Sequence, residues 1–190
     1  MSVLFARIPD DRVGVLIGPG GSTRRLIEEK TKAHLEIDAE EGMVGVSNAE
    51  TDDPLGAIQA REIVLAIGRG FSPQRAMRLL QDETYLAVID IKHVTGKQSK
   101  SAMWRIRSRL IGTAGRARSR LEELSGCSVS VYGSTVALIG KEPQLERATQ
   151  AIEMLLKGSE HSTVFHLLAR LRDEANRAEA LEPTELPGEE

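Results

Sequence analysis

The stretch that decides the fold is Leu-Ile-Gly-Pro-Gly-Gly at residues 16–21, because it returns 94 residues later as Leu-Ile-Gly-Thr-Ala-Gly at residues 110–115. Over residues 16–37 and 110–131, seven of 22 positions are identical. A chain of 190 residues is long enough for one medium domain or two small ones. The repeat decides between these possibilities and predicts two copies of one unit.

The same order of predicted elements surrounds the glycine segment in both copies. Hydrophobic periodicity and turn residues predict strand, helix, glycine loop, helix, strand, turn, strand and long helix, which is an α+β unit. In the first copy these elements cover residues 4–8, 11–17, 22–31, 34–37, 43–47 and 54–67. In the second copy they cover residues 85–91, 101–110, 116–124, 128–131, 135–139 and 143–156.

An additional helix is predicted after each copy. The first begins at Ser72-Pro73, and the second has an apolar stripe that includes Phe165. We expect Phe71 and Phe165 to pack these helices against the units. We divide the chain into a first unit at residues 1–71, a short helix and linker at residues 72–84, a second unit at residues 85–158, a C-terminal helix at residues 159–181 and an acidic, disordered tail at residues 182–190.

Charge is distributed unevenly along the chain, whose formal net charge is -3. Residues 91–121 contain nine bases and no acid, whereas the last 18 residues contain seven acids and one base. Solvated helix faces usually mix both signs, so the basic stretch favours phosphate binding. Residues 85–157 hold twelve bases and six acids, against eight and twelve in residues 1–71. The second unit is therefore expected to be the main site of contact with nucleic acid.

A glycine loop between two helices suits a sugar-phosphate backbone. The second helix begins at the loop, so its unpaired N–H groups and the positive end of its dipole face an approaching ligand. Glycines remove side chains that would keep the backbone away. A single Gly-x-x-Gly is more often an ordinary helix-helix turn, but here it occurs twice in the same context. The pattern predicts two loops that bind single-stranded RNA.

The sequence at this point resembles the KH family of RNA-binding domains, in which Ile-Gly-x-x-Gly clamps about four nucleotides. The resemblance covers nearly the whole chain. It implies two tandem eukaryotic-type (type I) KH domains, each β-α-α-β-β-α with a three-stranded antiparallel sheet. It also implies a protein that binds RNA without catalysis and without a cofactor.

Motifs outside the loops narrow the resemblance. They are Ala-Ile-Gly-Arg-Gly-Phe-Ser-Pro-Gln-Arg-Ala at residues 66–76, Val-Ile-Asp-Ile at residues 88–91 and Ser-Val-Tyr-Gly-Ser-Thr-Val-Ala at residues 130–137. They are similar to archaeal paired-KH proteins of ribosome maturation, relatives of the KRR and partner-of-Nob (Dim-two-like) families. This resemblance implies binding near the 3′ end of 16S ribosomal RNA precursors, with a Nob-type endonuclease and the α subunit of translation initiation factor two as partners.

Both loops depart from the family pattern, which usually has a lysine or arginine between the glycines. Proline also has no N–H, so the first loop loses one phosphate donor at Pro19. Affinity is then expected to come from flanking bases. The residues expected to bind RNA are Gly18, Pro19, Gly20, Gly21, Arg24 and Arg25 in the first unit, and Lys97, Lys100, Arg109, Gly112, Thr113, Ala114, Gly115, Arg116, Arg118 and Arg120 in the second.

Several other residues are candidates for a function. Trp104 lies among arginines and could stack on a base, but an amphipathic helix favours a tryptophan anchored in the core. His34 is interpreted as structural, and Cys127 as a small buried hydrophobe. No histidine spacing suggests a metal site. The adjacent carboxylates at residues 28–29 and 122–123 point in different directions on a helix, so they do not form a catalytic pair.

Other functional classes fit less well. The motifs of nucleotide-binding enzymes are missing, because the glycines at residues 18–21 follow a helix and no lysine accompanies them. No apolar run is long enough to span a bilayer, and the N-terminus lacks a signal-peptide pattern, so we expect a cytoplasmic protein. A protein-protein adaptor that docks a nuclease or an initiation factor, with weak RNA binding, remains the alternative.

Overall fold

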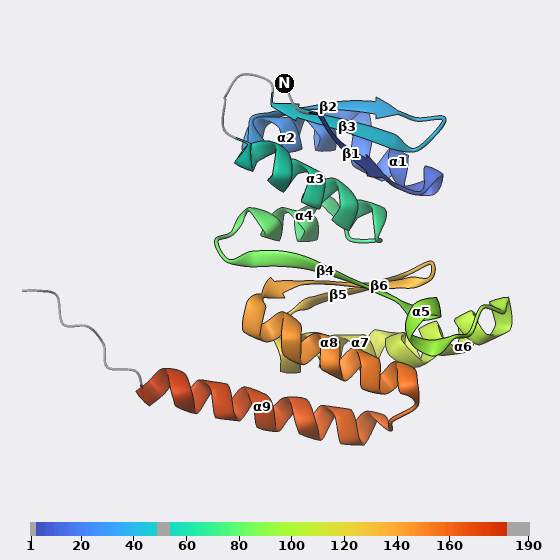
Figure 1. The fold of residues 1–190 in the computed structure, drawn as a ribbon, viewed down its shortest axis with the longest axis vertical. Coiled ribbons are helices and arrows are strands. Elements are labelled where there is room, and N and C mark those ends of the chain that lie inside the picture. Colours follow the sequence, from blue (N-terminus) through green and yellow to red (C-terminus); the bar gives the residue numbers. More distant parts are fainter. Residues whose placement is uncertain (1–2, 49–53, 182–190) are drawn as a thin grey trace, which may run out of the picture.

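The computed structural model describes residues 3–48 and 54–181 and contains two copies of the predicted unit (Figure 1). The first copy consists of β1 (Val3–Arg7), α1 (Asp10–Ile17), η1 (Pro19–Gly21), α2 (Ser22–Thr31), β2 (Ala33–Asp38), β3 (Met43–Asn48) and α3 (Leu55–Gly68). The second consists of β4 (Thr84–Asp90), α5 (Ile91–Thr95), α6 (Lys100–Ile111), η3 (Thr113–Gly115), α7 (Arg116–Ser125), β5 (Ser128–Tyr132), β6 (Thr135–Lys141) and α8 (Glu142–Lys157). The additional helices are α4 (Pro73–Ala76) with η2 (Met77–Leu80), and α9 (His161–Leu181).

Two three-stranded antiparallel sheets confirm the predicted α+β class. Their strand orders are β1-β3-β2 and β4-β6-β5, so the third strand of each unit lies in the centre. The predicted boundaries of the twelve unit elements agree with the structure within two residues. The predicted disordered tail at residues 182–190 lies outside the described residues.

One glutamate at the same position of both copies accepts an equivalent hydrogen bond. The backbone N–H of Leu35 donates to Glu28 Oε1 over 2.9 Å, and that of Val129 donates to Glu122 Oε1 over 2.7 Å. Each carboxylate thus ties the start of a strand to the helix before it. Glu28 and Glu122 therefore have a structural role.

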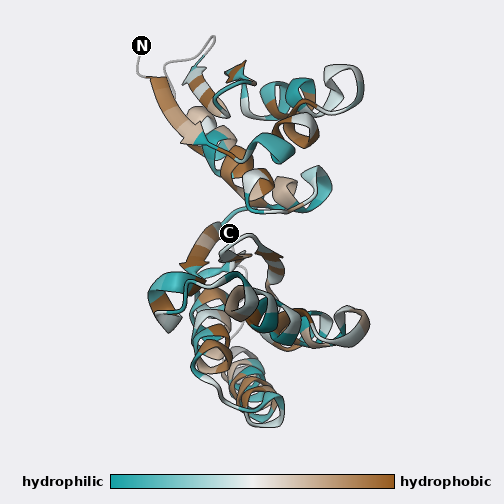
Figure 2. Ribbon diagram, turned by 90° about the vertical axis from the view of Figure 1, so that its right-hand side faces the viewer, coloured by the Kyte–Doolittle hydropathy of each residue, from teal (hydrophilic) through white to brown (hydrophobic). Residues whose placement is uncertain are grey.

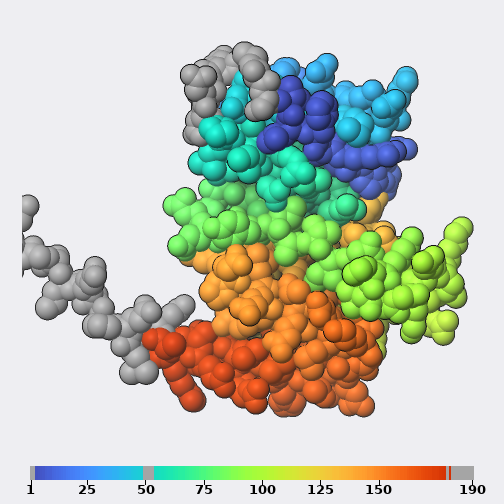
Figure 3. All heavy atoms as spheres, viewed as in Figure 1, coloured from blue at the N-terminus to red at the C-terminus, as the bar shows by residue number. Residues whose placement is uncertain are grey.

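The second copy contains an extension in which the longer helix α6 was predicted from the sequence, but the short helix α5 was not. In the 94-residue alignment, Asp10 at the start of α1 corresponds to Trp104 within α6. Only residues 8–9 separate β1 from α1, whereas residues 91–103 separate β4 from Trp104. This segment forms α5, a loop and an extra first turn of α6, and Figure 3 shows the yellow-green atoms of this region projecting from the side of the molecule.

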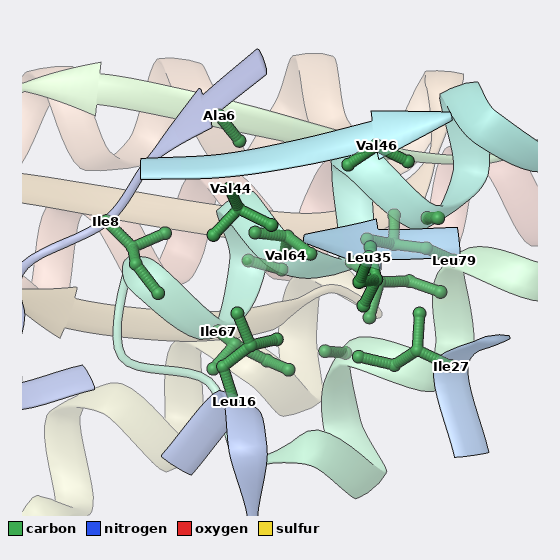
Figure 4. Close-up of a cluster of buried hydrophobic side chains, with 14 of the residues drawn as sticks. Ala6, Ile8, Leu16, Ile27, Leu35, Val44, Val46, Val64, Ile67 and Leu79 are labelled. Carbon is green, nitrogen blue, oxygen red and sulfur yellow. The ribbon is translucent and has the colours of Figure 1, made fainter. Parts of the chain in front are cut away.

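The core of the first unit forms between its sheet and its helices. Ala6, Leu35, Val44 and Val46 of the strands contact side chains of α1, α2 and α3 in one buried cluster (Figure 4). Hydrophilic and hydrophobic residues alternate along the helices (Figure 2). The apolar ones that face the sheet are buried, as expected for amphipathic helices that cover a sheet.

The second sheet is covered on both faces. Along its central strand, Val136 and Leu138 belong to the core of the second unit, whereas Ala137 and Ile139 belong to the cluster that includes α3 and η2. Residues that alternate along a strand point to opposite faces, so β6 contributes to two cores. Figure 1 accordingly shows α4 between α3 and the second sheet. The two units therefore share a buried interface.

Polar contacts reinforce this interface. Arg12 donates from Nε to the Ile67 carbonyl over 2.8 Å and from Nη2 to the Phe71 carbonyl over 2.7 Å. Its guanidinium carbon lies 5.7 Å from the centroid of the Tyr132 ring, a cation-π distance. Tyr132 also donates its hydroxyl to Asp11. One arginine of the first unit thus links its own last helix to the second sheet.

Candidate nucleic-acid interface

The two glycine loops have the same backbone conformation. Gly18 has φ 73° and ψ 172°, and Gly112 has φ 73° and ψ 174°. The last glycines, Gly21 and Gly115, are left-handed with φ of 77° and 75°. Each loop therefore turns in the same way between its two helices.

The first glycine of each loop is required by packing. A Cβ on Gly18 would lie 2.3 Å from Thr23 Oγ1, and one on Gly112 would lie 2.7 Å from Ala117 Cβ. Both positions also have positive φ, which side chains rarely adopt. These two glycines let the second helix begin close to the end of the first. The middle residues of both loops are exposed to solvent.

Ala114 is strained, because its φ is 54° where the first loop has Gly20 with φ 57°. Left-handed backbone costs an alanine about 1–2 kcal/mol, and the greater freedom of glycine in the unfolded chain offsets part of this cost. We expect Ala114→Gly to raise the free energy of unfolding by up to about 1 kcal/mol. Chemical denaturation would measure the change.

The matched control is Gly20→Ala, which places the same methyl group at the same position of the first loop. No other atom lies within 4 Å of that Cβ, so only the backbone conformation opposes it. We expect the free energy of unfolding to fall by a similar amount. Equal effects of the same sign in both variants would contradict this account.

Each loop leads directly into a helix whose first turn has no side-chain cap. The N-cap residues are Gly21 for α2 and Gly115 for α7, and neither offers a side chain to the N–H groups behind it. Uncapped helix starts can satisfy these donors with a ligand, and the helix dipole favours an anion there. Both loops are thus placed where an RNA phosphate could accept hydrogen bonds.

The arginine that the repeat shares has different partners in the two units. Arg24 Nε lies 3.3 Å from Glu28 Oε1. The equivalent Glu122 instead pairs with Arg75 of the inter-unit helix, so Arg118 has no carboxylate partner among the described residues. Arg118 Nη2 lies 3.9 Å from the Cβ position at Gly115, beside the loop. The second loop therefore has an uncompensated positive charge where the first has an ion pair.

The remaining predicted bases fall into two groups. Arg109 donates to the Gly158 carbonyl over 3.2 Å and Arg120 Nη1 lies 2.7 Å from Glu123 Oε2, so both have protein partners. The side chains of the others form no ion pair within residues 3–48 and 54–181. These unpaired bases are Arg25 beside the first loop, and Lys97, Lys100 and Arg116 in the second unit.

Both units of this chain are similar to known protein domains. Residues 85–173 match the model of the eukaryotic type KH domain (KH-domain type I), and residues 3–54 match that of the KH domain. A KH domain-containing protein of Methanocaldococcus jannaschii is 42% identical over 177 residues, which cover 93% of this chain and 77% of that protein. The crystal structure of Dim2p from Pyrococcus horikoshii superposes with a TM-score of 0.84 at 48% identity, covering 90% of this chain and 99% of that one. This chain belongs to the archaeal Dim2-type family of KH-domain proteins.

Two further solved structures resemble this Dim2-type chain. One is a protein of unknown function from Aeropyrum pernix, with a TM-score of 0.89, 38% identity and coverage of 95% of this chain and 96% of that one. The other comes from a complex of a/eIF2alpha, aDim2p and rRNA from Pyrococcus horikoshii, with a TM-score of 0.85, 48% identity and coverage of 91% and 95%. The predicted family is confirmed.

Trp104 corrects one expectation drawn from the sequence. Its side chain was predicted to anchor α6 in the core, but it is 64% exposed. The helix buries Met103 and Leu110 and partly buries Ile106, which lie on one face. A residue directly after Met103 points about 100° away from that face. This Dim2-type protein therefore presents its single tryptophan to solvent.

The structure also shows the surroundings of Cys127 and His34. Cys127 is buried as expected, and burial raises the pKa of its thiol to about 11. His34 is exposed, with Nδ1 lying 3.2 Å from Glu28 Oε1. No cluster of three or more potential metal ligands occurs in the described parts of the chain. Among the helices described here, none is long and apolar enough to cross a membrane.

Proposed function

We propose that this protein binds single-stranded ribosomal RNA during maturation of the small ribosomal subunit, without catalysing a reaction. The observation that carries the proposal is the second loop, an exposed turn at the uncapped start of α7 with unpaired bases around it. The RNA-binding domains of the KH family use such loops to clamp the backbone of about four nucleotides. The solved complex that contains aDim2p and rRNA supports this assignment.

We further propose that the bound segment lies near the 3′ end of 16S rRNA and that the second unit is the main clamp. Residues 85–157 carry a net charge of +6, with twelve bases and six acids, whereas residues 1–71 carry -4. The second loop also has Thr113, which has a backbone N–H, where the first has Pro19. A cytoplasmic location, and a Nob-type endonuclease as partner, remain predictions that accompany this role.

A steep dependence on salt is the expected signature of this binding. Each phosphate that a base neutralises on a single strand contributes about -0.7 to the slope of log affinity against log salt concentration. Four unpaired bases, Lys97, Lys100, Arg116 and Arg118, predict a slope of about -2.8. Fluorescence anisotropy of a labelled RNA oligonucleotide at several salt concentrations would measure it. The variant Arg116→Ala should reduce the slope by about 0.7.

The second candidate function is an adaptor, and one feature of the first unit favours it. Phe5 is 60% exposed and Val3 is 46% exposed on an outer face of β1. The corresponding strand of the second unit, β4, contacts η2, and its exposed hydrophobic side chains are Tyr85 (52%) and Val88 (45%). We propose this face as the contact for a protein partner such as the α subunit of initiation factor two, by analogy with the solved complex. A slope near zero would favour the adaptor over the RNA clamp.

A further inference from the structure

Helix α6 carries a stripe of side chains on the surface beside the second loop, and its extra first turn adds Lys100 to that stripe. Lys100, Trp104, Arg107 and Ile111 are spaced by four, three and four residues, so they share one face of the helix. The stripe ends at Ile111, directly before Gly112. It therefore leads from the loop along the helix to its N-terminal end.

Hydrogen bonds show on which side of α6 the stripe lies. Arg107 Nη1 donates to the Gly133 carbonyl over 3.4 Å, which places this flank toward the turn between β5 and β6. Arg109, on the other flank, contacts Gly158 at the end of α8. The stripe therefore begins at the proposed RNA-binding loop and runs along the flank of α6 that faces this turn, so it continues the proposed binding surface.

Trp104 is the aromatic member of the stripe and is the most exposed of the large hydrophobic side chains described. Its first-unit equivalent is Asp10, so the indole is a feature of the second unit alone. Lys100 precedes it by one turn, and residues 91–121 contain no acid. A planar apolar surface with positive charge on both sides matches a nucleic acid base whose phosphates lie beside the cations.

We propose that Trp104 stacks on an RNA base that lies beyond the nucleotides held by the loop. The inference rests on the proposed function and adds a second contact to it. Trp104 precedes Gly112 by eight residues, or about 12 Å along the helix axis. A tetranucleotide would fill the loop site, and a longer strand would be needed to reach the indole.

Intrinsic fluorescence tests the proposal directly, because Trp104 is the single tryptophan of the chain. We expect an RNA octanucleotide of mixed sequence to quench it strongly, and a tetranucleotide to quench it little. If the octanucleotide binds by anisotropy but the fluorescence does not change, the stacking proposal is wrong and the RNA clamp stands. If no RNA binds, both are wrong.

Substitutions separate stacking from charge. Base stacking on an aromatic side chain predicts a loss of affinity of roughly 5- to 150-fold for the octanucleotide in Trp104→Ala, with an unchanged salt slope. Trp104→Phe should recover most of the affinity. The control Tyr85→Ala removes another aromatic side chain, 52% exposed on β4, and should leave affinity unchanged. Full affinity in Trp104→Ala would overturn the proposal.

Discussion

RNA affinity is expected to fall at least about 100-fold when Thr113 and Ala114 are both replaced by aspartate, a change of about 2.7 kcal/mol. Two carboxylates would then stand where we place the RNA phosphates, and like charges brought together at an interface cost several kcal/mol. Both residues are exposed, and aspartate tolerates the left-handed backbone of the second position. The fold should therefore persist. Anisotropy with a labelled RNA octanucleotide would measure the loss.

The matched variant replaces Pro19 and Gly20 of the first loop by aspartate. Those positions are equally exposed, and no atom lies within 4 Å of a Cβ on Gly20. Because the first loop has fewer unpaired bases around it, we expect its loss to stay below about tenfold. Equal losses in the two variants would reject the second unit as the main clamp. Circular dichroism of both proteins would control for unfolding.

Phe71→Ala is expected to lower the free energy of unfolding by about 3–5 kcal/mol, the usual cost of removing a buried phenylalanine. The side chain is 1% exposed and belongs to the cluster that also contains Ala137 and Ile139 of the second sheet. Its loss therefore weakens both units. We expect the variant to unfold in a single transition at lower denaturant concentration, measured by circular dichroism.

The control for this substitution is Phe5→Ala, in which the same side chain is removed from a position that is 60% exposed. Surface substitutions usually change stability by less than about 0.5 kcal/mol. Two separate transitions in Phe71→Ala, with only the first shifted, would show that the units unfold independently. That result would contradict the shared interface.

The sequence contained enough information to predict the repeated unit and its loops. The periodicity of hydrophobic residues predicted the helices and strands because each element buries one face. The same pattern also occurs in both halves of the chain. The glycines at positions 18 and 112 signalled a tight turn, and the structure shows the clash that any side chain there would cause. Local requirements of this kind are visible in a single sequence.

Features that depend on long-range packing were harder to predict. Trp104 was expected in the core because amphipathic helices usually bury tryptophan, whereas α6 buries Met103 and Leu110 on a face that Trp104 does not share. Arg118 and Arg24 are identical in the alignment, yet Arg75 pairs with Glu122, 47 residues later in the sequence, which would otherwise be the partner of Arg118. Only the packing of α4 against the second unit reveals this difference.

The interface at β6 also bears on how a long RNA would occupy both loops. Because the two units share buried side chains, the protein fixes the distance between the two loops. An RNA bound to both loops must be long enough to cover that distance. Once the second loop holds a strand, capture by the first becomes intramolecular, with an effective concentration set by the intervening nucleotides. The affinity for such an RNA should then be highest at one number of nucleotides between the two bound segments, and the gain should be lost when that number is smaller. Binding to both loops would thus select RNA by the spacing of its two bound segments.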